Sequence, residues 1–407
     1  MSRPLLILSV TLAILAPVSG TADWLQFRGP LGNGTATGSD HLPTALDAAR
    51  HVAWSAALPG RGLSSPVVAG ERIFITAASG AEQQILHVFC FSAVDGTALW
   101  ERRFRATGRT MCHEKTNVAA PTPACDGERL FALFSSNDLF CLDFQGNLLW
   151  LRGLTYDYAN ASNSLGLASS LLVAGDTLIV QIENDSESFA AGLKVSNGRN
   201  RWKIDRPKAA NWTSPLLLRN TPAGDLVALQ STKGITAVLP ESGAILWEYT
   251  DGASPIPSSA VAGELLIVPS HGLTALKPPT AGGAPAVVWQ TGQLQPATAS
   301  PVVLGDKVYI LNGAGVLTTG RLSDGERLWR LRLEGPFAGS PVAASNHLYV
   351  FGERGIGQCV DLRGDEGVVV GTIDLGESIQ CTPAISRDAL YVRSDGHLWK
   401  IAADSEP

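Results

Sequence analysis

The sequence contains no run of basic residues and no DNA- or RNA-binding motif. Its 31 Lys and Arg residues are outnumbered by 37 Asp and Glu residues, which gives a formal net charge of −6. Nonspecific affinity for nucleic acid comes from clustered cationic side chains, so this composition argues against a nucleic-acid partner. No apolar stretch after residue 16 approaches the ~20 residues that a membrane-spanning helix requires. We therefore expect no transmembrane segment in the mature chain.

The motifs of several common enzyme classes are also missing. The seven histidines form no HExxH or other metal-ligand spacing, and the Gly-x-Ser-x-Gly motif of serine hydrolases does not occur. Glycine-rich stretches such as GAGVLTTG lie between predicted strands rather than before a helix, so they are not phosphate-binding loops. The sequence therefore predicts no metal site and no catalytic residue.

The N-terminal segment predicts export. Arg3 precedes an apolar run from Leu5 to Ala16, and small residues follow up to Ala22. This pattern is typical of a cleaved signal peptide over 1–22, and an uncleaved anchor is the alternative. No cysteine lies near the cleavage region, so we expect a periplasmic or secreted protein without a lipid anchor.

Export bears on the cysteines, because disulfides persist in oxidising compartments. The six cysteines allow fifteen pairings, and the sequence does not select among them. Cys112 and Cys125 flank one loop and are the best candidates for a disulfide.

A repeated unit is the main signal in the chain. Each unit begins with a hydroxyl residue, usually followed by Pro, and continues with short apolar runs separated by polar or glycine-containing turns. The spacings between successive units are 57, 48, 44, 44, 42, 40 and 42 residues. Periods of this length that contain several short strands are typical of β-propeller blades. The hydroxyl positions are Ser65, Thr122, Ser170, Ser214, Ser258, Ser300, Ser340 and Thr382.

Tryptophans close most of the units, usually four positions after a turn glycine, and we expect them to dock between neighbouring blades. The unit that begins at Ser340 has Gly371 where a Trp is expected. The last unit has three strands, and residues 51–55 at the other end of the chain can supply the fourth. The predicted docking residues are Trp54, Trp100, Trp150, Trp202, Trp247, Trp289 and Trp329.

The predicted fold is all-β: a single eight-bladed propeller of four-stranded antiparallel blades over 51–402, closed by an N-terminal strand. Seven blades would result if the unit that begins at Ser340 were a linker. Residues 23–50 are expected to form an irregular N-terminal arm, and 403–407 a tail.

The units resemble the PQQ-type (quinoprotein) propeller repeat. The resemblance covers about 51–402 and is carried by FSAVDGTALW, LDFQGNLLW, LKVSNGRNRW, VLPESGAILW and GRLSDGERLW. It implies either of two kinds of protein: quinone-dependent alcohol or sugar dehydrogenases, or BamB-type outer-membrane assembly proteins, which bind no cofactor. DWLQFRGPLGNG, HEKTNVAAPTP and neighbouring stretches also resemble a group of uncharacterised exported propellers.

The sequence favours the non-enzymatic kind. The dehydrogenases that the chain resembles carry a vicinal disulfide, and no two cysteines are adjacent here. The hydroxyl positions should line the central channel, yet the four residues before each include no Asp or Glu, and Arg61 is their only charged residue. We therefore expect no cofactor, and PQQ with calcium only under the oxidoreductase alternative.

Two long connections, 105–117 and 154–165, precede the first strands of the second and third blades, so both should emerge on the same face. Binding residues often lie on such loops. We expect a monomer that binds an envelope protein or a glycan, with a carbohydrate-binding module as a third alternative. The predicted binding surface consists of Arg61, His113, Lys115, Asn117, Asn163 and Trp212.

Overall fold

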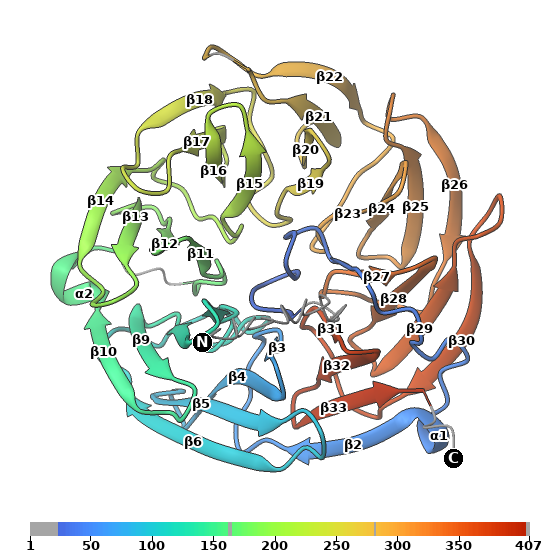
Figure 1. Cartoon of the computed structure of the whole chain (residues 1–407), viewed down its shortest axis with the longest axis horizontal. Coiled ribbons are helices and arrows are strands. Elements are labelled where there is room, and N and C mark those ends of the chain that lie inside the picture. The colour runs from blue at the N-terminus through green and yellow to red at the C-terminus, as the bar shows by residue number, and fades with distance from the viewer. Residues whose placement is uncertain (1–22, 162–164, 281, 404–407) are drawn as a thin grey trace, which may run out of the picture.

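The structure, a computed structural model, describes residues 23–161, 165–280 and 282–403. The predicted signal peptide at 1–22 and residues 404–407 of the predicted tail lie outside the described residues. In the described ranges the strands form eight sheets around one axis (Figure 1), which confirms the eight-bladed propeller. The seven-bladed alternative is wrong, because the unit that begins at Ser340 forms a complete blade. None of the described helices is long and apolar enough to cross a membrane.

Each blade is numbered in chain order, and its strands are given from the axis outwards. Blade one contains β3 (Val67–Ala69), β4 (Arg72–Ser79), β5 (Ile85–Ser92) and β6 (Ala98–Arg105), and blade two contains β7 (Ala124–Cys125), β8 (Arg129–Leu133), β9 (Asp138–Asp143) and β10 (Leu148–Gly153). Blade three contains β11 (Leu172–Ala174), β12 (Thr177–Ile182), β13 (Phe189–Lys194) and β14 (Asn200–Asp205), and blade four contains β15 (Leu216–Thr221), β16 (Gly224–Ser231), β17 (Gly234–Val238) and β18 (Ile245–Tyr249). Blade five contains β19 (Ala260–Ala262), β20 (Leu265–Val268), β21 (Leu273–Lys277) and β22 (Ala286–Thr291), and blade six contains β23 (Val302–Leu304), β24 (Lys307–Leu311), β25 (Val316–Arg321) and β26 (Arg327–Arg332). Blade seven contains β27 (Val342–Ala344), β28 (His347–Phe351), β29 (Ile356–Asp361) and β30 (Val368–Asp374), and blade eight contains β31 (Ala384–Ser386), β32 (Ala389–Arg393), β33 (His397–Ala402) and β2 (Val52–Ala57). The remaining described elements are β1 (Thr35–Ala36), α1 (Ala48–His51) and α2 (Leu154–Asp157).

Blade eight joins the two ends of the chain. The N-terminal β2 is its outermost strand and pairs antiparallel with β33, with Trp54 opposite Lys400 and Ser55 opposite Trp399. This confirms the predicted closure by an N-terminal strand. Closing the ring is favourable, because a complete circle of blades leaves only short strand edges unpaired.

The strand sequences follow the burial that a ring of packed sheets imposes. Second strands such as β12 are buried along their whole length, because both faces of the sheet contact neighbouring blades. The outermost β2 instead alternates between half-buried and exposed residues, with the two-residue period of a strand that has one face in water. Apolar clusters fill the spaces between the blades.

The closing tryptophans dock against the following blade. Trp100 of blade one donates its indole N–H to the Phe144 carbonyl of blade two, at 2.9 Å. Gly146 in the same turn has φ of +82°, and a Cβ at this position would lie 2.8 Å from the Trp100 ring. The turn glycine therefore serves two purposes: it adopts a left-handed conformation, and it leaves room for the indole of the preceding blade. Trp150, Trp202 and Trp289 donate equivalent hydrogen bonds to Val195, Pro240 and Leu322.

The N-terminal arm crosses one end of the ring (Figure 1). Trp24 forms a β-bridge with Val68 of blade one, and the Leu25 carbonyl accepts from the Cys125 amide of blade two at 2.8 Å. Further along, β1 pairs in parallel with β27 of blade seven. The arm then continues to α1 and β2 at the rim of the ring.

The arm also accounts for the missing tryptophan of blade seven. A Cβ at Gly371, in the outer strand β30, would overlap the backbone carbonyls of Thr44 and Ala45. Leu46 of the arm is 1% exposed and packs in the core cluster of blades seven and eight. The arm therefore passes directly over the position where the repeat predicts an indole, and only glycine leaves room for it.

Candidate functional site

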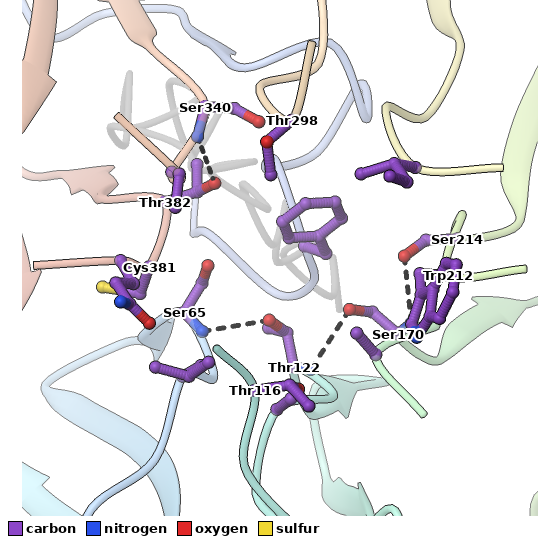
Figure 2. A pocket seen from close by; sticks show the side chains of 18 of the residues that line it. Ser65, Thr116, Thr122, Ser170, Trp212, Ser214, Thr298, Ser340, Cys381 and Thr382 are labelled. Carbon is purple, nitrogen blue, oxygen red and sulfur yellow. Dashed lines mark hydrogen bonds between the residues drawn. The ribbon is translucent and has the colours of Figure 1, made fainter. Parts of the chain in front are cut away.

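The eight predicted hydroxyl residues form a ring around the axis, which we call the hydroxyl ring. At seven of the eight steps in the described chain, the backbone N–H of one member donates to the side-chain oxygen of the next, at 2.9–3.1 Å. Figure 2 shows several of these bonds. The ring thus ties each first strand to the next blade, which is the structural role that buried hydroxyl groups commonly have.

The step from Thr382 to Ser65, between blades eight and one, is joined differently. Arg393 of blade eight donates from Nη1 to Ser64 Oγ at 3.1 Å and to the Thr76 carbonyl of blade one at 2.7 Å. The ring therefore closes through a buried arginine at the seam where the two ends of the chain meet.

A pocket of about 410 Å³ lies on the axis above the hydroxyl ring. All eight members of the hydroxyl ring line it, together with a second ring, which we call the upper ring, two residues earlier in each unit. Because side chains alternate along an extended chain, most residues between the two rings do not line the pocket, although Gly339 and Cys381 do. The upper ring consists of Leu63, Ala120, Ala168, Trp212, Ile256, Thr298, Ala338 and Gln380.

Phe27 of the N-terminal arm lines the pocket and closes the end that faces the arm, so the channel is blind. Next to it, Arg28 donates from Nη1 to the Ser259 carbonyl at 2.9 Å and from Nη2 to the Pro301 carbonyl. These two acceptors directly follow Ser258 and Ser300 of the hydroxyl ring. The arm is therefore fixed to blades five and six beneath the ring.

The two long connections meet at the open end of the pocket. The His113 amide donates to the Leu165 carbonyl at 3.1 Å, and both residues line the pocket with Lys115. The Trp212 indole donates to the Gly166 carbonyl at 2.9 Å. Three predicted surface residues, His113, Lys115 and Trp212, are thus brought together at one pocket mouth.

Arg61 lies beside this mouth and is held by several blades. Its Nε is 3.1 Å from Asp395 Oδ1, Nη2 is 3.3 Å from Gln380 Oε1, and Nη1 is 3.5 Å from the Thr116 carbonyl. Its charge is therefore paired with Asp395, and the side chain supports the rim at the seam between blades eight and one.

Asn117 does not belong to the binding surface, and this prediction is wrong. The residue is 1% exposed. Its Nδ2 donates to Gln83 Oε1 at 2.6 Å, and its Oδ1 accepts from the Ala119 amide at 2.8 Å. Asn117 therefore bonds to the Gln83 side chain in the turn between β4 and β5 and to a backbone amide of its own segment. The remaining predicted residue, Asn163, lies outside the described residues.

The predicted disulfide between Cys112 and Cys125 is not formed, because all six cysteines are free. Cys112 lies near the pocket mouth, with Sγ 3.5 Å from Gln83 Nε2. Cys125 lies on β7, buried within the core between blades one and two. The loop between the two cysteines runs from the pocket mouth into blade two. The two thiols flank the same loop, but they are not bonded to each other.

Two guanidinium groups are buried around the hydroxyl ring without a carboxylate partner among the described residues. Arg28 and Arg393 are each 1% exposed, and their hydrogen bonds go to carbonyl or hydroxyl oxygens. Burial lowers the pKa of Arg28 to about 9 and that of Arg393 to about 10. Both groups therefore stay charged at neutral pH.

Two networks of Ser, His and Glu lie outside the pocket. In blade one, His87 Nε2 is 2.6 Å from Ser79 Oγ, and His87 Nδ1 is 2.7 Å from Glu101 Oε1. In blade eight, Glu377 contacts both Ser394 and His397, at 2.6 Å each. A similar set in two blades indicates that these groups support the strand ends, and Ser79 does not line the central pocket.

The pocket is a poor match for a calcium-bound quinone. Calcium takes six to eight oxygen ligands, with carboxylates prominent among them. None of the described pocket-lining residues is Asp or Glu, and the described residues contain no group of three or more His, Cys, Asp or Glu that could hold a metal. The hydroxyls and the Gln380 amide are neutral and the described lining includes the cation Lys115, so the residues present do not fit this cofactor.

The fold and the pocket define a quinoprotein-like eight-bladed propeller with a blind central channel. The family model described as outer membrane protein assembly factor BamB matches residues 35–248, 272–370 and 322–405. The chain therefore belongs to this family.

Solved structures share the fold at low sequence identity. BamB from Moraxella catarrhalis is 18% identical, with a TM-score of 0.64, covering 88% of this chain and 98% of that one. A europium-containing methanol dehydrogenase is 12% identical, with a TM-score of 0.71 and coverage of 94% and 98%. The quinohemoprotein alcohol dehydrogenase from Comamonas testosteroni is 12% identical, with a TM-score of 0.72 and coverage of 96% and 82%. No curated protein matches the chain.

The sequence did not reveal the floor of the pocket. Phe27 and Arg28 lie in the arm, outside the repeat, so no periodic position marks them. All members of the upper ring could have been predicted from the sequence. Each of them lies two residues before a hydroxyl position, so its side chain faces the same way as that hydroxyl group.

Proposed function

We propose that this protein is an exported, non-enzymatic propeller of the cell envelope, which binds a partner at the face that surrounds the pocket mouth. The observation that carries the proposal is the pocket itself: a blind channel whose described lining includes no Asp or Glu, beneath a rim built by two long loops. Seven of its hydroxyl groups accept hydrogen bonds from backbone amides, and none of the lining residues that the structure describes offers a carboxylate base. The family to which the chain belongs, named for an outer membrane assembly factor, supports the envelope location.

The partner is a protein segment or a glycan that contacts His113, Lys115 and Trp212. A flat indole next to the exposed ammonium group of Lys115 suits either ligand, because aromatic rings supply apolar contact area and cations attract acceptor groups. We propose that the protein acts as a monomer and without a cofactor.

Partner capture from envelope extracts tests the platform. The double variant His113→Ala/Lys115→Ala should lose a partner that the unaltered protein retains. Lys277→Ala is the matched control, since Lys277 is an exposed cation paired with Glu264 at 3.0 Å and away from the pocket. An unchanged set of captured partners in the double variant would contradict the assignment of the binding surface.

Calorimetry with PQQ and calcium, together with a dye-linked alcohol oxidation assay, tests the absence of quinone catalysis. We expect no binding at tens of micromolar and no turnover. Saturable binding with turnover would establish the oxidoreductase alternative and overturn the proposal.

A further inference from the structure

The hydroxyl ring offers hydrogen-bond donors that have no acceptor among the described residues. Seven of its side-chain oxygens accept a backbone N–H. A hydroxyl group has one O–H donor and two lone pairs, so an accepted bond leaves the O–H free to donate. A ligand that places acceptor atoms on the axis would satisfy several of these donors together.

Positive charge surrounds the ring on the side away from solvent. Arg28 lies directly behind Ser258 and Ser300, and its Nε has no partner among the described residues. Arg393 bonds to Ser64, the residue before Ser65 of the ring, and its Nε and Nη2 also lack partners there. Asp395 partly offsets the charge of Arg393, whereas Arg28 has no such neighbour among the described residues. A buried charge acts through a low dielectric, so its field at the pocket is screened less than that of a surface charge.

At the open end of the pocket, Lys115 adds charge of the same sign. His113 and Lys115 line the mouth and are exposed, and no Asp or Glu belongs to the described lining. Arg61, also close by, is paired with Asp395. From mouth to floor the pocket therefore favours an anion over a cation.

The wall between the mouth and the hydroxyl ring is mainly apolar. Leu63, Ile256 and the three alanines of the upper ring supply aliphatic surface, and Trp212 supplies an aromatic face. A volume of about 410 Å³ lies within the range of small-molecule sites, roughly 300–1,000 Å³. A ligand for this pocket combines a compact anionic head with an apolar body.

We propose that the central pocket binds a monocarboxylate with an apolar body, with the carboxylate at the hydroxyl ring and the body against the upper ring. This inference deepens the proposed function by naming the ligand chemistry of the same face. The carboxylate comes either from a free organic acid or from the C-terminus of a polypeptide, since both present the same head group.

Calorimetry on the full mature protein tests the head group with three probes of equal chain length: octanoate, octan-1-ol and octylamine. We expect saturable binding of octanoate, at least tenfold weaker binding of octan-1-ol, and no binding of octylamine. The expected ratio follows from exchanging charge-assisted hydrogen bonds for neutral ones. Equal binding of the acid and the alcohol, or no binding of octanoate at 5 mM, would overturn the proposal.

Ser65→Ala locates the carboxylate. In the described chain the Ser65 hydroxyl accepts no hydrogen bond from another member of the ring, so its removal takes away a donor and leaves the seven ring bonds intact. We expect about a tenfold loss of octanoate affinity and an unchanged affinity for octan-1-ol. Ser242→Ala, which removes an exposed turn hydroxyl, is the control. An unchanged octanoate affinity in Ser65→Ala would refute the placement at the ring.

Two variants of Arg28 test whether its buried positive charge contributes to octanoate binding. Arg28→Lys keeps the charge and should retain octanoate binding, whereas Arg28→Met removes the charge and should weaken it at least tenfold, with both variants first checked for native circular dichroism. If Arg28→Met disrupts folding, the Ser65→Ala result decides the matter alone.

The peptide N-acetyl-Ala-Ala-Leu and its C-terminal amide distinguish the two sources. Binding of the acid but not the amide, tighter than octanoate, identifies a polypeptide C-terminus, while tighter octanoate binding identifies a free acid. The result separates cleanly from the proposed function: lost partner capture in His113→Ala/Lys115→Ala with no carboxylate binding would refute this inference alone, and quinone turnover would refute the proposed function.

Discussion

Gly243 provides the sharpest test of how the blades are held together. It lies in the turn before β18 with φ of +69°, and a Cβ there would lie 2.5, 2.7 and 2.8 Å from three atoms of the Trp202 indole of the preceding blade. Gly192 of Trp202's own blade also contacts this indole, and the indole N–H donates to the Pro240 carbonyl at 2.7 Å. The ring is thus fixed on several sides and cannot move away from an added methyl group.

Gly243→Ala therefore combines two costs. The left-handed backbone costs an alanine about 1–2 kcal/mol, and the methyl group inserted against the indole adds about 1–3 kcal/mol. Gly175→Ala is the matched control, because Gly175 has φ of +59° in a comparable turn but nothing within 4 Å of an added Cβ. It should show the first cost only.

Urea unfolding of the two variants, compared through their midpoints at equal m-value, measures the difference. A second comparison adds Trp202→Phe, whose smaller ring leaves room for the methyl group, so the double variant should cost less than the sum of the single changes. If Gly243→Ala and Gly175→Ala lower stability equally, the indole contact contributes nothing and the account of blade docking is wrong.

Three further predictions concern the arm and the cysteines. Gly371→Ala should detach the arm from blade seven, which faster proteolysis before β2 would detect, and an unchanged cleavage rate would refute that contact. Because the cysteines are free, Ellman's reagent should titrate six thiols in unreduced, denatured protein. In native protein at pH 8 it should titrate at most one thiol, that of the half-exposed Cys112. A count of four in the denatured protein would show a disulfide. Burial raises the pKa of Cys90 and of Cys141 to about 12, so the folded state keeps protons that the unfolded state loses above pH 9. The stability that this contributes is lost as pH rises from 9 towards 12, and Cys90→Ala/Cys141→Ala should flatten this fall in urea midpoint.

The blades, the docking tryptophans and the ring closure could be predicted because each depends on a pattern repeated along the chain. The hydroxyl ring followed from the same repeat. The path of the arm could not be predicted, because Trp24, Arg28 and Leu46 contact different blades and no period relates them. Asn117 illustrates a second limit of sequence reasoning: a polar loop residue has the same sequence signal whether it faces solvent or is buried and bonded to another side chain, as Asn117 is to Gln83.

The pairing of β2 with β33 inside blade eight has a consequence for how this chain reaches its native state. The partners β2 and β33 are about 340 residues apart, and bringing together the ends of so long a loop costs about 5 kcal/mol of chain entropy. In every other blade the four antiparallel strands are consecutive in the chain, so their hairpins can form as soon as their own residues are available, and only blade seven gains a further strand, β1, from the arm. During synthesis from the N-terminus, β2 has no strand partner until the last blade has emerged. The pairing of β2 with β33 is therefore expected to be a late step of assembly.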